Sequence, residues 1–233
     1  WSQVAVPHDW AIAGPFDKKW DLQMVAIEQN GEKEKTEKSG RSGALPWIGE
    51  GMYKMNLQLP KGYKRAVLVF DGAMSQPVVS VNGKEAGRWA YGYNAFRIDI
   101  TPYVKFGGKK NLVEVHLNNV EESSRWYPGG GLYRPVSVEL YGNENFSTWD
   151  TFVRTLKADK QEAEVEVNAL LEGKIGKSGK TVIALLDEAG TKVAEQTISG
   201  AAPAIKTTLK VANPQLWSPE SPYLYQVKLT RYE

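Results

Sequence analysis

Apolar and polar residues alternate along much of the first part of the chain, with the period of two that half-buried β-strands show. The run from Met52 to Leu59 alternates and ends at Pro60. Val78 to Val81 leads into Asn82-Gly83, a pair that tolerates positive φ in a hairpin turn. The strand-like segments are residues 52–59, 66–70, 78–81, 96–101, 113–118 and 136–141. Short strands separated by turn residues, with no amphipathic helix of real length, predict a β-sandwich or jelly roll.

The pattern resumes in simpler form after Tyr141-Gly142-Asn143-Glu144-Asn145, which we interpret as a domain boundary. The strand-like segments beyond it are residues 163–171, 181–186, 205–211 and 223–229. About five to seven short strands in about 90 residues are typical of an immunoglobulin-like sandwich. We therefore predict an all-β chain, with a jelly-roll β-sandwich at residues 1–143 and an immunoglobulin-like β-sandwich at residues 144–233.

One segment departs from both patterns. Residues 28–41 are rich in Glu, Lys and Gly and have no apolar residue at a useful period, so we expect an exposed, mobile loop there.

Composition narrows the classes of function. The chain has 233 residues, of which 42% are hydrophobic and 24% charged, so it can bury a sizeable core. Its formal net charge is +2, with scattered charges, which gives no electrostatic case for a nucleic-acid or membrane partner. Two histidines and no cysteine argue against a transition-metal site, and we expect no cofactor. The lack of cysteine leaves the compartment open, and we favour a periplasmic or secreted location.

The most distinctive stretch of the sequence runs from Ser124 to Arg134, with the order Ser-Arg-Trp-Tyr-Pro-Gly-Gly-Gly-Leu-Tyr-Arg. Pro128 fixes φ, and Gly129 to Gly131 permit backbone angles that a side chain forbids. We therefore expect a tightly shaped loop that carries aromatic and arginine side chains at the start of a strand. Such a loop can offer a sugar a stacking plane and hydrogen-bond donors. The alternative is that its aromatics only close the end of a sandwich.

Other candidate chemistry is weaker. His8 and Asp9 could act as a base and its orienting group, but no nucleophile with a matching environment is visible. His116 lies in an alternating strand, where an exposed or satisfied side chain is the simpler interpretation. Ser124 lacks the Gly-x-Ser-x-Gly context of a hydrolase nucleophile. Gly129 to Gly131 do not form a phosphate loop, because no helix follows them.

A series of motifs occurs in a fixed order along nearly the whole chain. They are Val6-Pro7-His8-Asp9-Trp10, Gly49 to Lys54, Phe70-Asp71-Gly72, Val81-Asn82-Gly83, Gly92-Tyr93 with Phe96 and Asp99, Ser124 to Arg134, and Asn213-Pro214 with Leu216 to Tyr225. In this order they resemble the N-terminal part of glycoside hydrolase family 2, the family of β-galactosidases, β-glucuronidases and β-mannosidases. Met52 stands where an aromatic is commoner in the family, and Lys54 stands where arginine is usual.

The resemblance implies a sugar-binding jelly roll of the galactose-binding type, followed by an immunoglobulin-like domain. In the family a catalytic (β/α)8 barrel comes next and carries two glutamates, an acid/base and a nucleophile. We expect this barrel to be absent from the chain, together with one strand that the family has before Val6. Asn143-Glu144 mimics the dipeptide of the family's acid/base, and we interpret it as a coincidence.

By the same resemblance, the substrate-proximal residues are Ser124, Arg125 and Trp126, while no catalytic residue and no metal site is expected in the chain. Arg125 would donate hydrogen bonds to hydroxyls or a carboxylate, and Trp126 would stack against the sugar or close the wall.

The predicted function is therefore that of a non-catalytic N-terminal region of a family 2 glycoside hydrolase of β-galactosidase type. It would shape the active-site wall of a parent enzyme that acts on a carbohydrate substrate, pack beside the missing barrel and help to hold the subunits of a homo-oligomer together. The alternatives are a self-standing carbohydrate-binding module and a structural or adhesive pair of sandwiches.

Overall fold

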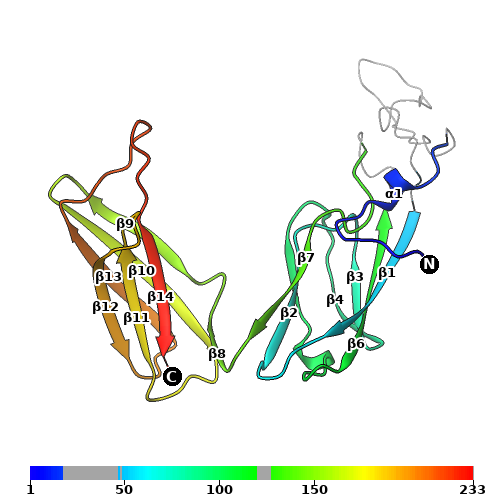
Figure 1. Ribbon diagram of the computed structural model, residues 1–233, viewed down its shortest axis with the longest axis horizontal. Coiled ribbons are helices and arrows are strands. Elements are labelled where there is room, and N and C mark those ends of the chain that lie inside the picture. Colours follow the sequence, from blue (N-terminus) through cyan, green and yellow to red (C-terminus); the bar gives the residue numbers. More distant parts are fainter. Residues whose placement is uncertain (18–46, 48, 120–126, 233) are drawn as a thin grey trace, which may run out of the picture. The chain divides into compact units, whose positions relative to one another are not determined.

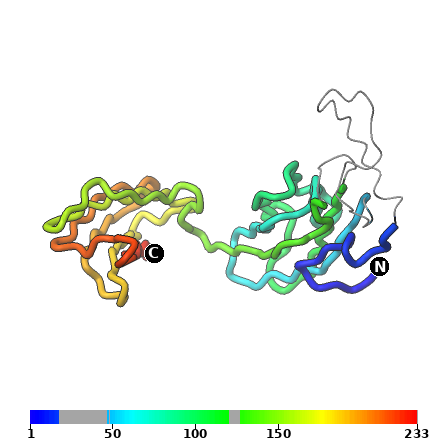
Figure 2. Tube along the Cα trace, turned by 90° about the horizontal axis from the view of Figure 1, so that it is seen from above, coloured from blue at the N-terminus to red at the C-terminus, as the bar shows by residue number. Residues whose placement is uncertain are grey.

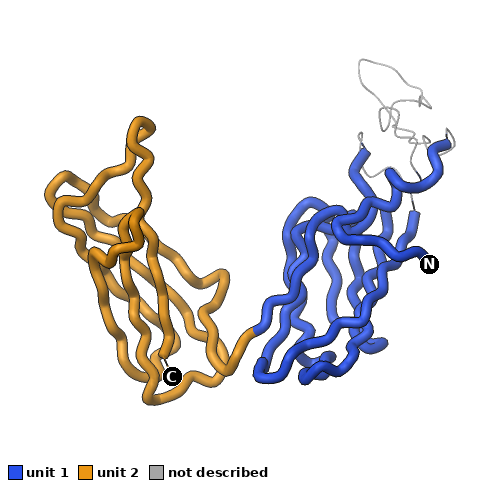
Figure 3. Tube along the Cα trace, viewed as in Figure 1, with its two compact units in different colours: residues 1–140 blue, residues 141–233 orange. Residues whose placement is uncertain are grey.

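The computed structural model describes residues 1–17, 47, 49–119 and 127–232. The segment at residues 28–41 and the predicted substrate-proximal residues, Ser124, Arg125 and Trp126, lie outside the described residues. The regular secondary structure of the described part of the chain is almost entirely β-strand, which confirms the all-β fold. It forms two compact units, residues 1–140 and 141–233 (Figure 3). Among its helices none is long and apolar enough to cross a membrane.

Unit 1 is built from two antiparallel sheets (Figure 1). The first has the order β1-β6-β3-β4, with β1 at Gly49–Gln58, β6 at Lys110–Asn119, β3 at Val78–Val81 and β4 at Lys84–Arg88. The second has the order β5-β2-β7, with β5 at Phe96–Asp99, β2 at Arg65–Phe70 and β7 at Val136–Tyr141. Two short helices accompany them, α1 at Trp10–Ala13 and a 3-10 turn at Thr101–Tyr103.

The core of unit 1 lies between these sheets because the alternating apolar residues of each strand point inward. Its buried residues include Leu68 and Phe70 of β2, Val79 and Val81 of β3, Phe96 and Ile98 of β5, and Val113, Val115 and Leu117 of β6. The rings of Phe70 and Phe96 stack with centroids 4.6 Å apart. The turn at Asn82-Gly83 has φ of 52° and 78° and joins β3 to β4, so the predicted hairpin is present.

Unit 2 also contains antiparallel sheets. In one, β10 at Glu162–Gly173 pairs with β13 at Ala204–Ala212, β8 at Glu144–Phe146 and β9 at Phe152–Ala158. In the other, β11 at Lys180–Leu186 pairs with β12 at Lys192–Ser199 and β14 at Gln226–Tyr232. Buried residues of β10, β11 and β13 form a second core, made of Val167, Ala169, Leu171, Ile183, Leu185, Ile205, Leu209 and Val211.

The last predicted strand, residues 223–229, begins too early. The strand β14 starts at Gln226. Tyr223 and Tyr225 precede it, with their rings 5.1 Å apart, and their hydroxyls accept hydrogen bonds from the backbone N–H groups of Glu188 and Gln215. These hydrogen bonds hold the tyrosines in a loop, which the alternation of residues along the sequence does not reveal.

An ion pair fixes β14 of unit 2 to β8. Arg231 Nε lies 2.7 Å from Glu144 Oε2, and the two side chains are only 8% and 3% exposed. The other carboxylate oxygen accepts a hydrogen bond from the Gly176 N–H. Arg231 also donates to the carbonyls of Gly200 and Gly176, each at 3.0 Å. Each nitrogen of the guanidinium and each oxygen of the carboxylate therefore has a hydrogen-bond partner within the fold, which a buried pair needs to be tolerated.

Candidate functional site

The described part of the candidate loop, Tyr127–Arg134, bends sharply at its glycines. Gly129 and Gly131 have φ of 89° and 112°, which other residues adopt only with strain. Gly131 exchanges two backbone hydrogen bonds of 2.9 Å with Met74. A Cβ atom on Gly131 would lie 2.7 Å from the His8 carbonyl oxygen and would collide with the Tyr53 hydroxyl. The space around Gly131 therefore admits only a glycine.

The N-terminal segment runs beside this loop and holds it. The first residues of the chain lie along the outer side of β1 (Figure 2), where Lys54 Nζ lies 5.0 Å from the Trp1 ring. His8 N–H donates to the Leu132 carbonyl at 2.8 Å, and Trp10 N–H donates to the Gly130 carbonyl at 3.0 Å.

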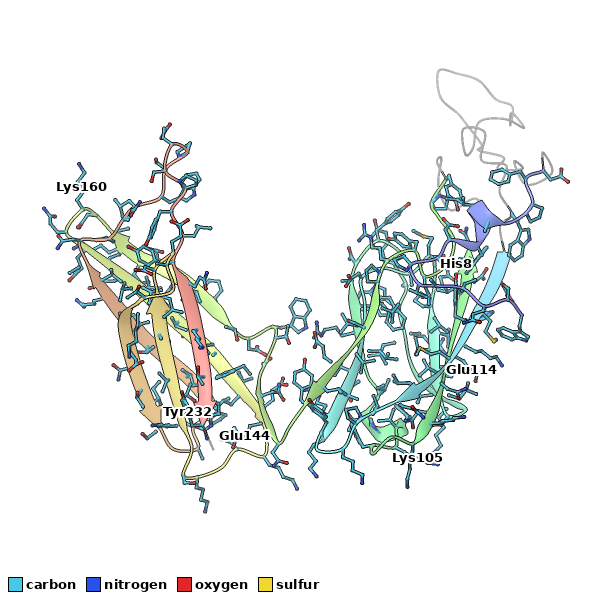
Figure 4. The ribbon with its side chains drawn as sticks, in the orientation of Figure 1. His8, Lys105, Glu114, Glu144, Lys160 and Tyr232 are labelled. Carbon is cyan, nitrogen blue, oxygen red and sulfur yellow. The ribbon has the colours of Figure 1, made fainter. Side chains whose placement is uncertain are left out.

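Asp9 connects the N-terminal segment to the loop in a second way. Its side chain accepts hydrogen bonds from the N–H groups of Ala11 and Ile12, which makes it the N-cap of α1. The Tyr127 hydroxyl lies 2.7 Å from both of its carboxylate oxygens. His8 is labelled in Figure 4, at the end of unit 1 that carries α1, and its Nδ1 lies 2.8 Å from the Tyr53 hydroxyl. His8 and Asp9 thus hold the loop in place through two tyrosines, and they do not contact each other as a base and its orienting group would.

Tyr133 and Arg134 connect the loop to a neighbouring turn. The Tyr133 hydroxyl donates to the Gly92 carbonyl at 2.8 Å, and burial raises the pKa of Tyr133, so its phenol remains a donor at neutral pH. Arg134 donates to the carbonyls of Asp71 and Tyr93, at 3.3 and 3.2 Å. The loop and the turn at residues 89–95 therefore support each other.

Two buried side-chain atoms beside the loop have no hydrogen-bond partner in the described part of the chain. They are Trp10 Nε1, a donor, and Asn119 Oδ1, an acceptor. The amide nitrogen of Asn119 donates to the Gly129 carbonyl at 2.9 Å, so the side chain is oriented by the loop itself. Because a buried polar atom without a partner costs free energy, this end of unit 1 retains capacity for a water or a ligand hydroxyl.

A cavity of about 1030 Å³ in unit 1 lies against the supports of the loop, because His8, Trp10 and Leu132 are part of its wall. Its wall includes Tyr53, Met55 and Leu57 of β1 and Val136 and Val138 of β7. These strands are edges of the two sheets. The lining is mostly apolar, with aromatic and aliphatic side chains, whereas a sugar site needs several convergent polar groups, so we do not assign substrate binding to this cavity.

Two residues considered in the sequence have structural contacts. His116 of β6 places Nε2 at 3.3 Å from Glu50 Oε2, in agreement with the simpler interpretation of this residue. For Glu144, labelled in Figure 4, the hydrogen bond from the Gly176 N–H, followed by that from Arg231, holds the pKa below its usual range. A general acid needs the opposite shift, so Glu144 is unsuited to that role. No group of three or more potential metal ligands occurs among the residues with described positions.

The sequence points to this loop, but not to its partners. Tyr53 lies 79 residues before Leu132 of the loop, so the sequence does not reveal their contact. Asn119 ends a strand whose alternation predicts only that its side chain faces the core. The sequence signal for these partners was the motif Val6-Pro7-His8-Asp9-Trp10, which lies far from the loop along the chain.

Comparison with known proteins relates the chain to a family of glycoside hydrolases. Residues 146–232 match the model of glycosyl hydrolases family 2. The chain is 32% identical over 233 residues to a putative β-glucuronidase of Formosa agariphila, and 33% identical over 236 aligned residues to the β-galactosidase BoGH2A of Bacteroides ovatus. These alignments include 98% and 97% of the chain. Residues 146–232 thus match glycosyl hydrolases family 2, and nearly the whole chain is similar to relatives described as a β-glucuronidase and a β-galactosidase.

A family 2 structure from Bacteroides cellulosilyticus matches all of the chain with a TM-score of 0.79 and 30% sequence identity. The chain spans 20% and 26% of the two curated relatives and 30% of that solved chain. It therefore corresponds to a minor part of each of these family 2 proteins.

Proposed function

We propose that the chain is a non-catalytic part of a family 2 glycoside hydrolase that cleaves β-linked sugars. In this proposal unit 1 is the sugar-binding jelly roll and unit 2 the immunoglobulin-like domain. The observation that carries it is the identity of 32–33% along almost the whole chain to relatives described as a putative β-glucuronidase and a β-galactosidase. A β-galactoside is the first substrate to test and a β-glucuronide the second.

The reacting groups of the proposed enzyme lie outside these residues. A retaining glycosidase needs two carboxyl groups about 5 Å apart on a rigid site. The carboxylates that the sequence brings to attention have other partners here, since Asp9 accepts from Tyr127 and caps α1, and Glu144 pairs with Arg231. We propose that a catalytic barrel elsewhere in the parent enzyme supplies the acid/base and the nucleophile.

In the parent enzyme, Ser124, Arg125 and Trp126 would form one wall of the sugar pocket. Support comes from the adjoining residues, because Tyr127–Arg134 are fixed by Asp9, His8 and Met74. A loop that is held at one end in this way presents its side chains with a small entropic cost on binding. Assembly into a homo-oligomer is part of the same proposal.

A turnover assay tests the proposed function. The 233-residue chain and a longer protein that includes the proposed barrel are each incubated with 4-nitrophenyl β-D-galactopyranoside and β-D-glucuronide. We expect hydrolysis of at least one substrate by the longer protein and none by the 233-residue chain, because we assign the catalytic carboxyl pair to the barrel. Turnover that purifies with the 233-residue chain, or a longer protein inactive on every β-glycoside, would refute the proposal.

A further inference from the structure

The turn at residues 89–95 of unit 1 presents an aromatic ring that is covered on one face and open on the other. Trp89 stacks on Phe96, with centroids 5.6 Å apart and an interplanar angle of 9°. Phe96 in turn stacks on Phe70 at 4.6 Å and 4°. The inner two rings are buried, whereas Trp89 is 41% exposed. The three rings therefore form a stack that begins in the core and ends with a flat indole at the surface.

Tyr91 extends this aromatic surface. It is 55% exposed, and its ring meets that of Tyr93 edge-on at 5.6 Å. Among the described residues between Arg65 and Asn111, Trp89 and Tyr91 are the exposed large hydrophobic side chains, and both combine an apolar ring with a polar group. Rings of this kind suit a sugar, because each offers an apolar face to the C–H groups and a polar group to the hydroxyls.

The backbone under these rings is fixed. Trp89 N–H donates to the Pro77 carbonyl at 3.0 Å, and Tyr133 and Arg134 bond the carbonyls of Gly92 and Tyr93. A Cβ atom on Gly92 would lie 2.6 Å from Met74 Cε, which shows how closely the turn packs on unit 1. A rigid surface loses little conformational entropy when it binds a ligand.

The two arginines next to the rings have partners within the fold. Arg88 pairs with Glu85 at 2.8 Å at the end of β4. Arg134 contributes a second guanidinium to this turn, but it donates to the carbonyls of Asp71 and Tyr93. With both arginines engaged in this way, the ring surface suits a neutral pyranose whose C–H groups face the indole.

We propose that Trp89 and Tyr91 form a stacking surface for a neutral pyranose unit of an oligosaccharide. Its residues differ from Ser124, Arg125 and Trp126, the residues of the predicted wall. The proposal rests on the proposed function only for the choice of sugars as probes. In the enzyme it would bind a sugar unit of the substrate at a position other than the one cleaved.

NMR titration of the 233-residue chain with lactose and with cellobiose tests this surface. Trp89→Phe identifies the indole N–H signal of Trp89 among those of the eight tryptophans. We expect that signal to shift saturably, with a Kd of about 1 mM, and Trp89→Ala to weaken binding about tenfold or more. Tyr91→Ala should weaken binding as well. Tyr63→Ala is the matched control. Tyr63 is a 40% exposed aromatic that lies just before the start of β2, whereas Phe70 of the ring stack lies at its end, so the substitution should leave the affinity unchanged.

Two results would overturn the proposal: no saturable shift of the Trp89 signal with either sugar, or an affinity that Trp89→Ala and Tyr91→Ala leave unchanged. Trp89→Ala uncovers Phe96, which can disturb folding. If the Trp89→Ala variant does not fold, the affinity of the Tyr91→Ala variant tests the proposal in its place. If no sugar binds at Trp89 and Tyr91, the outcome of the turnover assay is unaffected, because hydrolysis by the longer protein does not require this surface.

Discussion

Replacing Arg231 with alanine is expected to lower the unfolding free energy of unit 2 by about 3–5 kcal/mol. The guanidinium is buried, and its removal leaves the Glu144 carboxylate, which is 3% exposed, without its cation. The carbonyls of Gly176 and Gly200 lose their donors as well. Urea denaturation followed by circular dichroism measures the loss in the transition of unit 2.

Lys192→Ala is the control for this substitution. Lys192 pairs with Glu195 on β12 at 2.9 Å, but the two side chains are 53% and 38% exposed. Because water screens such a pair, its removal should cost about 1 kcal/mol or less. Equal effects of the Arg231 and Lys192 substitutions would show that burial of the Glu144–Arg231 pair does not matter to unit 2.

The same carboxylate gives unit 2 a sensitivity to acid. Hydrogen bonding from the Gly176 N–H, and then from Arg231, lowers the pKa of Glu144 in the folded state. A group with a lowered folded pKa contributes stability above its unfolded pKa, about 4.3, and this contribution is lost as the pH falls through the folded value. Glu144→Gln should therefore be less stable at neutral pH and should lose less stability on acidification than the unsubstituted chain does.

Gly131→Ala is expected to destabilise unit 1 by about 3 kcal/mol or more. An alanine at this position must adopt a φ of 112°. Its methyl carbon must also displace the His8 carbonyl oxygen, which lies 2.7 Å from the ideal Cβ position. Both the hydrogen bonds to Met74 and those to the N-terminal segment would be disturbed. Thermal unfolding monitored by circular dichroism gives the change in stability.

Gly83→Ala separates backbone strain from steric collision. Gly83 has a φ of 78°, but a Cβ atom there meets nothing within 4 Å. It should cost about 1 kcal/mol, the penalty for the backbone angle alone. If Gly131→Ala costs no more than Gly83→Ala, the loop is not held against the N-terminal segment as described.

The sequence predicts best where structure depends on neighbours along the chain. Asn82-Gly83 indicates its hairpin because both residues tolerate positive φ, and the alternation of Val113 to Asn118 indicates β6 because one face of that strand is buried. The alternation at Tyr223 and Tyr225 predicts a strand where the structure has a loop. The tyrosine hydroxyls there accept hydrogen bonds from backbone groups that are distant in sequence, and these bonds override the alternation.

The candidate site shows the same limit more strongly. Its glycines could be predicted to bend the chain, since their angles are a local property. The roles of His8 and Asp9 could not, because their partners Tyr53 and Tyr127 lie 45 and 118 residues away. His8 and Asp9 are residue types that often act in catalysis, but here they support the loop. Only the folded arrangement distinguishes a supporting role from a catalytic one.

The central claim, that the loop from Ser124 to Arg134 forms a wall of a sugar pocket, is tested most directly by kcat/KM of the longer protein. Arg125→Ala and Trp126→Ala should each lower kcat/KM by about 10–100-fold, the loss of one charged hydrogen bond or one stacking ring. Arg65→Ala, which removes an exposed pair with Asp99, should change it less than about twofold. If the Arg125 and Trp126 variants keep the kcat/KM of the unsubstituted enzyme, this loop does not contact the substrate and the account is wrong.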